Sequence, residues 1–223
     1  MLYLYAITDS PEPPERGGLR AARLRAIDEG GLVAIVSEHA DLRLEATEDD
    51  LWTHEEVVEE LMNRAAVLPM RLASTLPDEE AVRATLRERR HEFEAALEHV
   101  RGAVELGVRA VIDIEPSDRP VAGTTSGGGP GTAYMLSRLE RQRRGADAAA
   151  RIHEPLAELA RRSTHRLGSQ PQPLLNASYL VDRDRLEAFK ARAEQVSDEV
   201  TEATIVCTGP WPPYSFSSPE SER

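Results

Sequence analysis

The 223-residue sequence predicts an α+β protein of two mixed domains with antiparallel sheets. Three observations lead to this fold class. Residues 23–27 alternate polar and apolar and residues 32–37 are an apolar run; they flank a glycine-containing turn at residues 28–31 and predict a β-hairpin. Strand patterns and helix patterns follow one another in both halves of the chain. Residues 116–131, which are rich in glycine and proline, separate the halves and predict a linker.

The first domain is expected to span residues 1–115 and to begin with a strand. Residues 2–7 are apolar, include two tyrosines and predict this strand, and the hairpin follows it. Asp49 or Asp50 can cap a helix that continues to about residue 65. The predicted apolar face of this helix comprises Leu51, Val58, Leu61 and Met62.

Three further elements complete the first domain. Residues 67–72 are expected to be extended, because Pro69 cannot continue a helix. A proline followed by acidic residues at positions 77–80 predicts the start of one long helix, which ends at Gly102. Residues 104–114 have the pattern of a strand. The apolar stripe of the long helix comprises Val82, Leu86, Phe93, Leu97 and Val100.

The second domain is expected to span residues 132–216, with a tail at residues 217–223. Its sequence predicts a long helix at residues 132–167 that bends near Pro155, since an interior proline removes one helical hydrogen bond. The remaining predicted elements are a strand at 174–181, a helix at 183–200 and a strand at 203–208.

The acidic composition limits the classes of partner. A formal net charge of −12 repels phosphate backbones and anionic membranes, so we expect neither nucleic acid nor a membrane as a partner. No run approaches the roughly 20 apolar residues that a membrane span needs. The apolar N-terminal run also lacks the basic residues of a signal peptide. These observations predict a cytoplasmic protein.

Cys207 is the single cysteine of the sequence, so an intrachain disulfide is excluded. It lies between Val206 and Thr208 in a predicted strand, and no histidine or lysine is close in sequence to lower its pKa. We therefore expect a small core residue rather than a reactive thiol.

The histidines and glycines do not form a recognisable reactive motif. His91, Glu94 and Glu98 share one helix face, but the sequence has no second Glu-x-x-His helix to complete a carboxylate metal site. His54 lacks the second histidine of a zinc protease motif, so we expect it on an exposed helix surface. His153 is expected to be a hydrogen-bonded histidine near the helix bend. The glycine-rich linker is not followed by the lysine of a phosphate-binding loop. We predict no catalytic residue, no cofactor and no metal.

The segment Gly209–Phe216 is the most distinctive part of the chain. It holds three of the ten aromatic residues, and its three prolines make it stiff and prevent it from continuing as an interior strand. Two interpretations stay open: its rings fold back over the second domain, or they form a rigid contact surface for a partner. The candidate partner-binding residues are Trp211, Pro212, Pro213, Tyr214 and Phe216, together with Arg71 beside Pro69.

Five blocks along the chain share one family pattern. They are Leu2–Ile7, Gly31–Ser37, His54-Glu55 with Val67–Arg71, Leu174–Asp182, and Cys207–Phe216. With these blocks the sequence resembles the gas vesicle F/L family (GvpF/GvpL), accessory proteins of the gas-filled protein organelles of buoyant microbes. The last block is the most specific of the five. The pattern does not separate the F type from the L type.

The resemblance implies a fold and a function. It implies two α+β domains, the second ferredoxin-like, and a non-enzymatic role as a minor structural component or assembly factor in the cytoplasm and the gas vesicle. The implied partners are the small hydrophobic shell subunit (GvpA-like) and other gas vesicle accessory proteins. Two alternatives remain: an enzyme on a ferredoxin-like scaffold that uses His54 or His153, and a general protein-interaction module.

Overall fold

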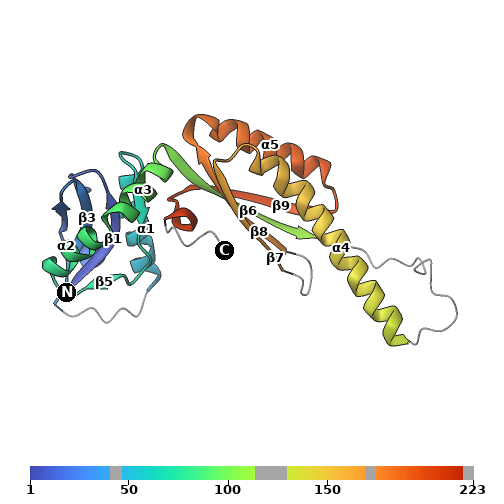
Figure 1. The fold of residues 1–223 in the computed structure, drawn as a ribbon, viewed down its shortest axis with the longest axis horizontal. Coiled ribbons are helices and arrows are strands. Elements are labelled where there is room, and N and C mark those ends of the chain that lie inside the picture. The colour runs from blue at the N-terminus through green and yellow to red at the C-terminus, as the bar shows by residue number, and fades with distance from the viewer. Residues whose placement is uncertain (41–46, 114–129, 169–173, 218–223) are drawn as a thin grey trace. The chain divides into compact units, whose positions relative to one another are not determined.

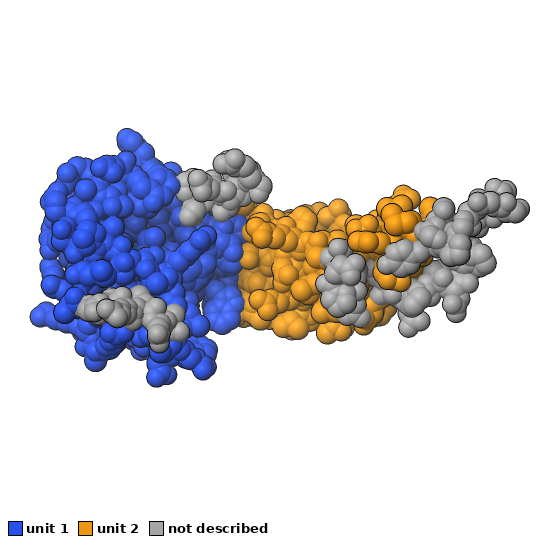
Figure 2. Space-filling model, turned by 90° about the horizontal axis from the view of Figure 1, so that it is seen from below, with its two compact units in different colours: residues 1–105, 210–223 blue, residues 106–209 orange. Residues whose placement is uncertain are grey.

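The computed structural model describes residues 1–40, 47–113, 130–168 and 174–217. They form an α+β fold with two antiparallel sheets, one of five strands and one of four (Figure 1). The chain divides into two compact units (Figure 2). Unit 1 holds residues 1–105 and 210–223, and unit 2 holds residues 106–209. The predicted linker lies outside the described residues, apart from the start of the helix that follows it.

Unit 1 is built around β1 (Leu2–Thr8), the central strand of the five-stranded sheet. The strand order is β2-β3-β1-β4, and β5 also pairs with β1. All seven residues of β1 are buried, and alternate residues of a strand face opposite sides, so both faces of β1 are covered. The other strands are β2 (Leu24–Glu29), β3 (Leu32–Glu38), β4 (Val67–Pro69) and β5 (Thr75–Leu76).

The predicted hairpin is confirmed as β2 and β3, which pair in an antiparallel register. Gly30 and Gly31 form its turn with φ angles of +64° and +93°, a conformation that only glycine adopts without strain at both positions. The Asp28 carboxylate accepts a 2.9 Å hydrogen bond from the Gly31 N–H group. The local sequence therefore determines the type of this turn.

Helix α1 (Glu48–Met62) begins one residue after Thr47, which is the N-cap in place of the predicted Asp49 or Asp50. The Thr47 hydroxyl accepts a hydrogen bond from the Asp50 N–H group, and the Asp50 carboxylate accepts one from the Thr47 N–H group. This capping box turns Asp50 toward the protein, whereas Leu51 is 43% exposed, so the prediction that Leu51 lies on the apolar face is wrong. Val58, Leu61 and Met62 are buried as predicted.

The predicted long helix is two helices, α2 (Glu79–Glu88) and α3 (Arg90–Val100), that meet at Arg89. Asp78 caps α2, since its carboxylate accepts a 2.9 Å hydrogen bond from the Ala81 N–H group. The predicted apolar stripe is buried along both helices. The apolar residues keep their helical spacing across Arg89, so the sequence pattern predicts one continuous helix and does not reveal the break.

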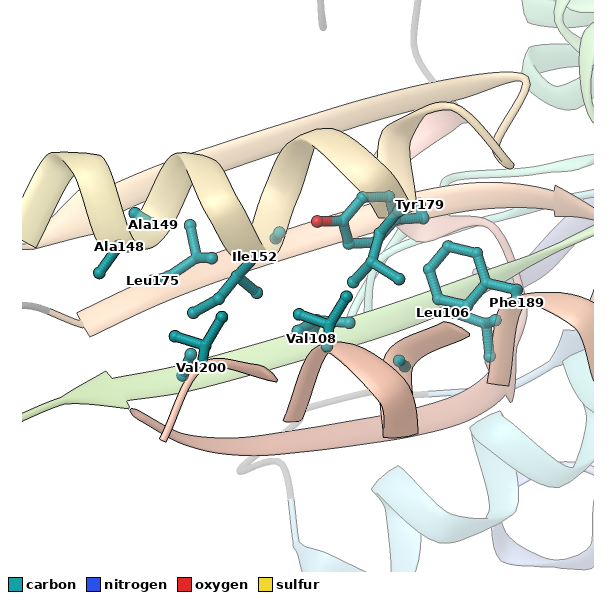
Figure 3. Close-up of a cluster of buried hydrophobic side chains, with 14 of the residues drawn as sticks. Leu106, Val108, Ala148, Ala149, Ile152, Leu175, Tyr179, Phe189 and Val200 are labelled. Carbon is teal, nitrogen blue, oxygen red and sulfur yellow. The ribbon is translucent and has the colours of Figure 1, made fainter. Parts of the chain in front are cut away.

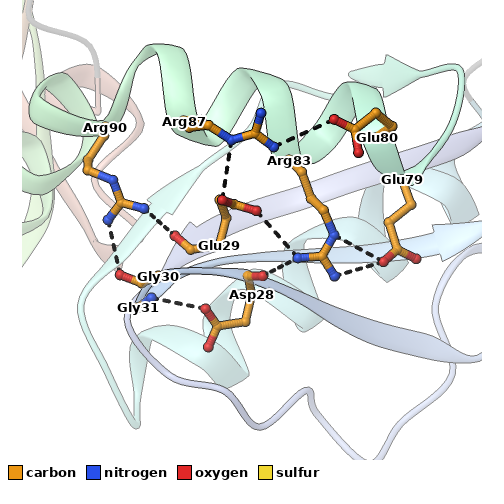
Figure 4. A network of polar contacts seen from close by, with 9 residues as sticks. All are labelled: Asp28, Glu29, Gly30, Gly31, Glu79, Glu80, Arg83, Arg87 and Arg90. Carbon is orange, nitrogen blue, oxygen red and sulfur yellow. Dashed lines mark hydrogen bonds and ion pairs between the residues drawn. The ribbon is translucent and has the colours of Figure 1, made fainter.

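Three arginines of α2 and α3 hold the hairpin turn (Figure 4). Arg90 donates hydrogen bonds of 2.6 Å and 3.0 Å to the carbonyl oxygens of Glu29 and Gly30. Arg87 and Arg83 form ion pairs with the Glu29 carboxylate at 3.3 Å and 3.5 Å. A Cβ atom at Gly30 would lie 2.6 Å from Nη2 of Arg90, and the φ angle of +64° would strain any other residue at this position. The ion pairs are partly exposed and stabilise the fold by no more than about 1 kcal/mol each.

Unit 2 contains the four-stranded sheet and two helices. The strand order is β7-β8-β6-β9. In chain order its elements are β6 (Ala103–Ile112), α4 (Pro130–Ala157), β7 (Arg162–Gly168), β8 (Leu174–Asp182), α5 (Leu186–Glu199) and β9 (Ala203–Trp211). The predicted strands at 174–181 and 203–208 and the predicted helix at 183–200 are thus confirmed.

The core of unit 2 lies between the sheet and the two helices (Figure 3). Alternate residues of β6 point into it, including Leu106 and Val108. Ile152 of α4, Phe189 of α5 and Tyr179 of β8 are all fully buried there. Because β6, β8 and both helices bury apolar side chains in this core, the removal of apolar surface from water stabilises the unit.

Two predictions for unit 2 are wrong. The helix predicted to reach residue 167 ends at Ala157, and β7 follows it, paired with β8 over seven residues. Strand β7 is an edge strand of mostly polar residues, so its sequence lacks the apolar alternation of a half-buried strand. Cys207 lies in β9 as predicted, but it is exposed because β9 is the other edge strand.

Among the described residues, no helix combines the length and the apolar character that crossing a bilayer requires.

Ile152→Ala tests the core of unit 2. Removing this fully buried side chain leaves a cavity, so we expect the free energy of unfolding to fall by about 2–5 kcal/mol. Leu139→Ala is the matched control, because Leu139 is on the same helix but 52% exposed, and it should change stability by less than about 0.5 kcal/mol. Urea unfolding followed by circular dichroism measures both, and equal midpoints for the two variants would contradict the assigned core.

Candidate partner-binding site

The C-terminal strip, Gly209–Phe216, leaves the edge of the sheet of unit 2 and ends in unit 1. Gly209 has a φ angle of +114°, at the residue where the chain passes from unit 2 to unit 1. From Pro210 onward the strip belongs to unit 1, so the prediction that its rings fold over the second domain is wrong. Residues 210–216, which the sequence assigned to the second domain, are thus part of the first compact unit.

The side chains of the strip divide into buried and exposed groups. Pro212, Pro213 and Phe216 are buried, and Tyr214 is half-buried. Trp211 is 49% exposed. The residues Tyr214–Phe216 form a single 3₁₀ turn. The strip is therefore fixed by its last residues, and it presents one large indole ring to solvent.

A buried carboxylate anchors the end of the strip. Glu105 of β6 accepts a 2.8 Å hydrogen bond from the Ser215 N–H group and a 2.6 Å hydrogen bond from the Ser215 hydroxyl. Glu105 is only 8% exposed, and hydrogen bonds to a buried charged group are stronger than neutral ones. Sequence reasoning missed this residue, although an acid between the apolar residues Val104 and Leu106 was a signal of a specific partner.

Tyr214 connects the strip to helix α1. Its hydroxyl is buried, and the charge that acts on it most strongly is the carboxylate of Glu55. Burial raises the pKa of Tyr214, and it also raises the pKa of Glu55. Glu55 therefore takes up a proton at a higher pH than a solvated glutamate does, close to the point where the strip meets α1.

A pocket of about 410 Å³ lies between the strip and the segment that follows β4. We call it the Arg71 pocket. Its apolar wall consists of Ile7, Leu68, Pro69, Met70 and Phe93. Its polar lining consists of Arg71, Ser74, Arg89, Tyr214, Ser215 and Ser217. The structure thus brings together Arg71 and Tyr214, two candidate residues that the sequence places in different halves of the chain.

The two arginines of the pocket differ in whether an acidic side chain pairs with them. Arg89 pairs with Glu92, with 2.7 Å between Nε and Oε2, and its guanidinium lies 4.7 Å from the centre of the Phe93 ring. Arg71 is exposed, and among the described residues no acidic side chain forms an ion pair with it. Within the described part of the chain, no acidic residue lines the pocket. The described lining therefore carries positive charge within an acidic protein.

His54 supports the wall of the pocket from inside unit 1. It is 1% exposed, so the prediction of an exposed histidine is wrong. The Met70 carbonyl oxygen lies 3.0 Å from Nε2 of His54 and can only accept, so Nε2 carries the proton. Nδ1 then accepts a 2.7 Å hydrogen bond from the Tyr3 hydroxyl. The ring is neutral, and burial lowers the pKa of His54 to about 4.

Tyr5 extends this buried polar network. Its ring stacks on His54 with 5.6 Å between the ring centres. Its hydroxyl accepts a 2.7 Å hydrogen bond from the Leu19 N–H group and shares a 2.9 Å hydrogen bond with the Ser37 hydroxyl. Burial raises the pKa of Tyr5, so the phenol stays neutral. Strands β1 and β3, helix α1 and the residue that follows β4 are therefore tied to one network.

The other two histidines that the sequence singled out, His91 and His153, lie on different helices, α3 and α4. The His91 side chain is fully exposed. His153 forms a 2.8 Å hydrogen bond with the Tyr179 hydroxyl, as expected of a hydrogen-bonded histidine, and its ring centre lies 4.0 Å from that of His165. Among residues with described positions, no group of three or more His, Cys, Asp or Glu side chains is arranged to hold a metal ion.

Comparison with known proteins gives a consistent relationship over the whole chain. The model of the family described as "Gas vesicle synthesis protein GvpL/GvpF" matches residues 1–218. The chain is 33% identical over 236 residues to gas vesicle protein F of Streptomyces sp. (strain CB03234), covering 96% of this chain and 98% of that protein. It is 30% identical over 248 residues to gas vesicle protein L of the same strain, covering 96% of this chain and 92% of that protein.

Two solved structures share the fold. The crystal structure of the gas vesicle protein GvpF from Anabaena sp. PCC7120 superposes with a TM-score of 0.84 at 19% identity, covering 97% of this chain and 98% of that one. The crystal structure of GvpF from Microcystis aeruginosa gives a TM-score of 0.81 at 19% identity, with the same coverage. At this identity the likeness establishes the fold alone.

The neutral state of His54 makes the stability of unit 1 depend on pH. The unfolded chain protonates His54 below its ordinary pKa of 6.5, whereas the folded chain does so only near pH 4. The free energy of unfolding therefore falls as pH decreases from 6.5 to 4, by up to about 3 kcal/mol from this group. Urea unfolding followed by tryptophan fluorescence measures it, since both tryptophans lie in unit 1.

His54→Gln should remove this part of the pH dependence, although it also lowers stability at neutral pH. His91→Gln, on the exposed face of α3, should leave the dependence unchanged. An equally steep fall in stability for His54→Gln and the unsubstituted chain would show that another group titrates.

Glu105→Ala tests the anchor of the strip. The substitution leaves the Ser215 N–H group without its acceptor, which costs about 1–3 kcal/mol of local stability. Amide hydrogen exchange at Ser215 and Phe216 should then become about tenfold faster or more. Glu98→Ala removes only an exposed ion pair with Arg101 and should leave these rates unchanged. Unchanged exchange in Glu105→Ala would mean that the strip is held by its buried rings and prolines.

Proposed function

The chain belongs to the GvpL/GvpF family of gas vesicle synthesis proteins, and we propose that it binds the small hydrophobic shell subunit (GvpA-like) during vesicle formation. In this role it is a minor structural component or an assembly factor that also binds other gas vesicle accessory proteins. The family is non-enzymatic, so the alternative of an enzyme that uses His54 or His153 is set aside.

The physical need for such a protein follows from what the shell does. A shell that encloses gas requires a water-repelling inner face, and a free shell subunit therefore exposes apolar surface that favours aggregation. A soluble accessory protein can cover this surface until the subunit joins a growing edge. A net charge of −12 keeps such a carrier dispersed in solution.

The observation that carries the proposal is the exposed Trp211 on a rigid strip. Pro212, Pro213 and Phe216 are buried and hold the backbone on either side of the half-buried Tyr214. A large aromatic ring on a backbone with little freedom loses little entropy on binding. Tryptophan and tyrosine are also enriched among the residues that contribute most to protein interfaces. We assign the contact surface to the strip and to Arg71.

The location and the partners follow from the same proposal. The protein acts in the cytoplasm and at the gas vesicle, where shell subunits are added. Its acidic charge disfavours nucleic acid and anionic membranes as partners. It carries out no chemistry of its own and uses no cofactor in this role.

We also propose the ferredoxin-like label for unit 2. The chain order of strand, helix, two strands, helix and strand supports it. The spatial order β7-β8-β6-β9 places the first and third strands of the unit side by side in the middle of the sheet, which also agrees with this label.

Trp211→Ala tests the contact surface. The indole is 49% exposed, so the variant should fold normally and bind the shell subunit about tenfold more weakly or worse. Co-purification with a tagged shell subunit and a titration of the two proteins measure the loss. Trp52→Ala is the matched control, because Trp52 is 59% exposed on α1 and lies outside the strip. Equal binding by Trp211→Ala and the unsubstituted protein would remove the strip from the mechanism.

A further inference from the structure

We propose that the Arg71 pocket binds a carboxylate together with the apolar side chain beside it, both presented by a partner polypeptide. This inference rests on the proposed function only in taking the partner to be a protein. The chemistry of the pocket itself specifies the two groups that it receives, and it can be tested without knowing the partner.

The apolar wall determines one half of the ligand. Ile7 of β1, Leu68 and Pro69 of β4, Met70 just after β4, and Phe93 of α3 form this wall. A pocket of about 410 Å³ lies near the lower end of the range for small-molecule sites, roughly 300–1,000 Å³. It therefore suits one side chain with its neighbouring peptide groups. An aliphatic side chain gains most from such a wall, because binding removes apolar surface from water on both sides.

The polar lining determines the other half. Ser74, Ser217 and Arg71 line the pocket with two hydroxyl groups and a guanidinium, and its described lining residues include no acid. Arg71 is the lining cation that forms no ion pair with any described acidic side chain, whereas Arg89 is already paired with Glu92. A guanidinium binds a carboxylate through two parallel hydrogen bonds, and this geometry gives both strength and orientation.

The negative net charge of the protein favours a singly charged anion over a doubly charged one as the ligand of the pocket. One uncompensated guanidinium balances one negative charge. A phosphate dianion would bring a second charge into the field of a protein with a net charge of −12. A carboxylate brings one charge and can be attached directly beside an apolar side chain. A polypeptide supplies this pair in two ways, through a C-terminal residue or through an Asp or Glu next to an apolar residue.

Both walls of the pocket are held in place before any ligand binds. On one side, buried His54 fixes the Met70 carbonyl, and the Met70 N–H group donates a 2.9 Å hydrogen bond to the Tyr5 carbonyl. On the other side, buried Glu105 fixes Ser215 through two hydrogen bonds. A site whose walls are already ordered loses less entropy on binding. Each anchor acts on a residue that lines the pocket, Met70 on one side and Ser215 on the other.

The test is a nuclear magnetic resonance titration of the full ¹⁵N-labelled chain with four small probes. Acetyl-leucine and acetyl-Leu-Glu-amide carry a carboxylate, at the chain end and on a side chain respectively. Acetyl-leucine amide and acetyl-Leu-Gln-amide are their neutral counterparts. We expect at least one carboxylate probe to shift the amide signals of Met70, Ser74 and Phe93 in a saturable way. It should bind about tenfold more tightly than its neutral counterpart.

Substitution of Arg71 separates the charge effect from the apolar contact. Arg71→Gln should weaken the carboxylate probes about tenfold and leave the neutral probes unchanged. Arg71→Glu should abolish binding of the carboxylate probes by repulsion. Arg109→Gln is the matched control, since it makes the same change of charge at an exposed position in unit 2, and it should bind all probes as the unsubstituted chain does. Arg71 is itself exposed, so the variants should keep the fold, and their spectra will show whether they do.

Each result has a definite meaning. Saturable binding of a carboxylate probe that depends on Arg71 supports the inference, and the better of the two probes identifies the source of the carboxylate. Equal binding of charged and neutral probes, no saturable binding, or binding unchanged in Arg71→Gln would overturn it. If the probes fail while Trp211→Ala still loses the shell subunit, only the pocket inference falls. If the probes bind while the unsubstituted protein does not bind the shell subunit, the proposed function falls and the pocket remains.

Discussion

A neutral histidine at the centre of unit 1 is the constraint on which the candidate site depends. His54 donates a hydrogen bond to the Met70 carbonyl and accepts one from the Tyr3 hydroxyl, so it ties a helix, the central strand and the segment after β4 to one another. A charged ring in this place would lack solvent and a counter-ion. The buried, fully hydrogen-bonded imidazole of His54 therefore determines where the Met70 backbone lies, and with it the position of the pocket wall.

The second support of the site is a buried acid. Glu105 holds the final turn of the C-terminal strip by accepting two hydrogen bonds from Ser215. Both supports are polar groups inside an apolar unit, and each one positions backbone that lines the Arg71 pocket. The exposed Trp211 lies on the same strip. In this member of the family of gas vesicle synthesis proteins, a strip with an exposed tryptophan therefore lies beside a pocket that Arg71 lines.

Much of the fold could be predicted because local signals determine it. The glycine pair of the hairpin and the proline with acids before α2 each act within a few residues. The misplaced elements lacked such a signal. Strand β7 is polar because it lies at the edge of its sheet, and the break at Arg89 leaves the apolar period intact. Edge position and helix direction depend on neighbours that are distant in sequence.

By itself, the sequence determined the fold class, the family and the residue types of the candidate site. A stiff segment rich in proline and aromatic residues can be recognised in the sequence, because proline restricts the backbone wherever it occurs. Only the tertiary structure decided that the C-terminal strip belongs to unit 1, that His54 is buried, and that Arg71 and Tyr214 line one pocket. These facts depend on which groups lose contact with water when distant segments meet. Such burial arises only in the folded protein, and the spacing of apolar residues along the chain does not predict it.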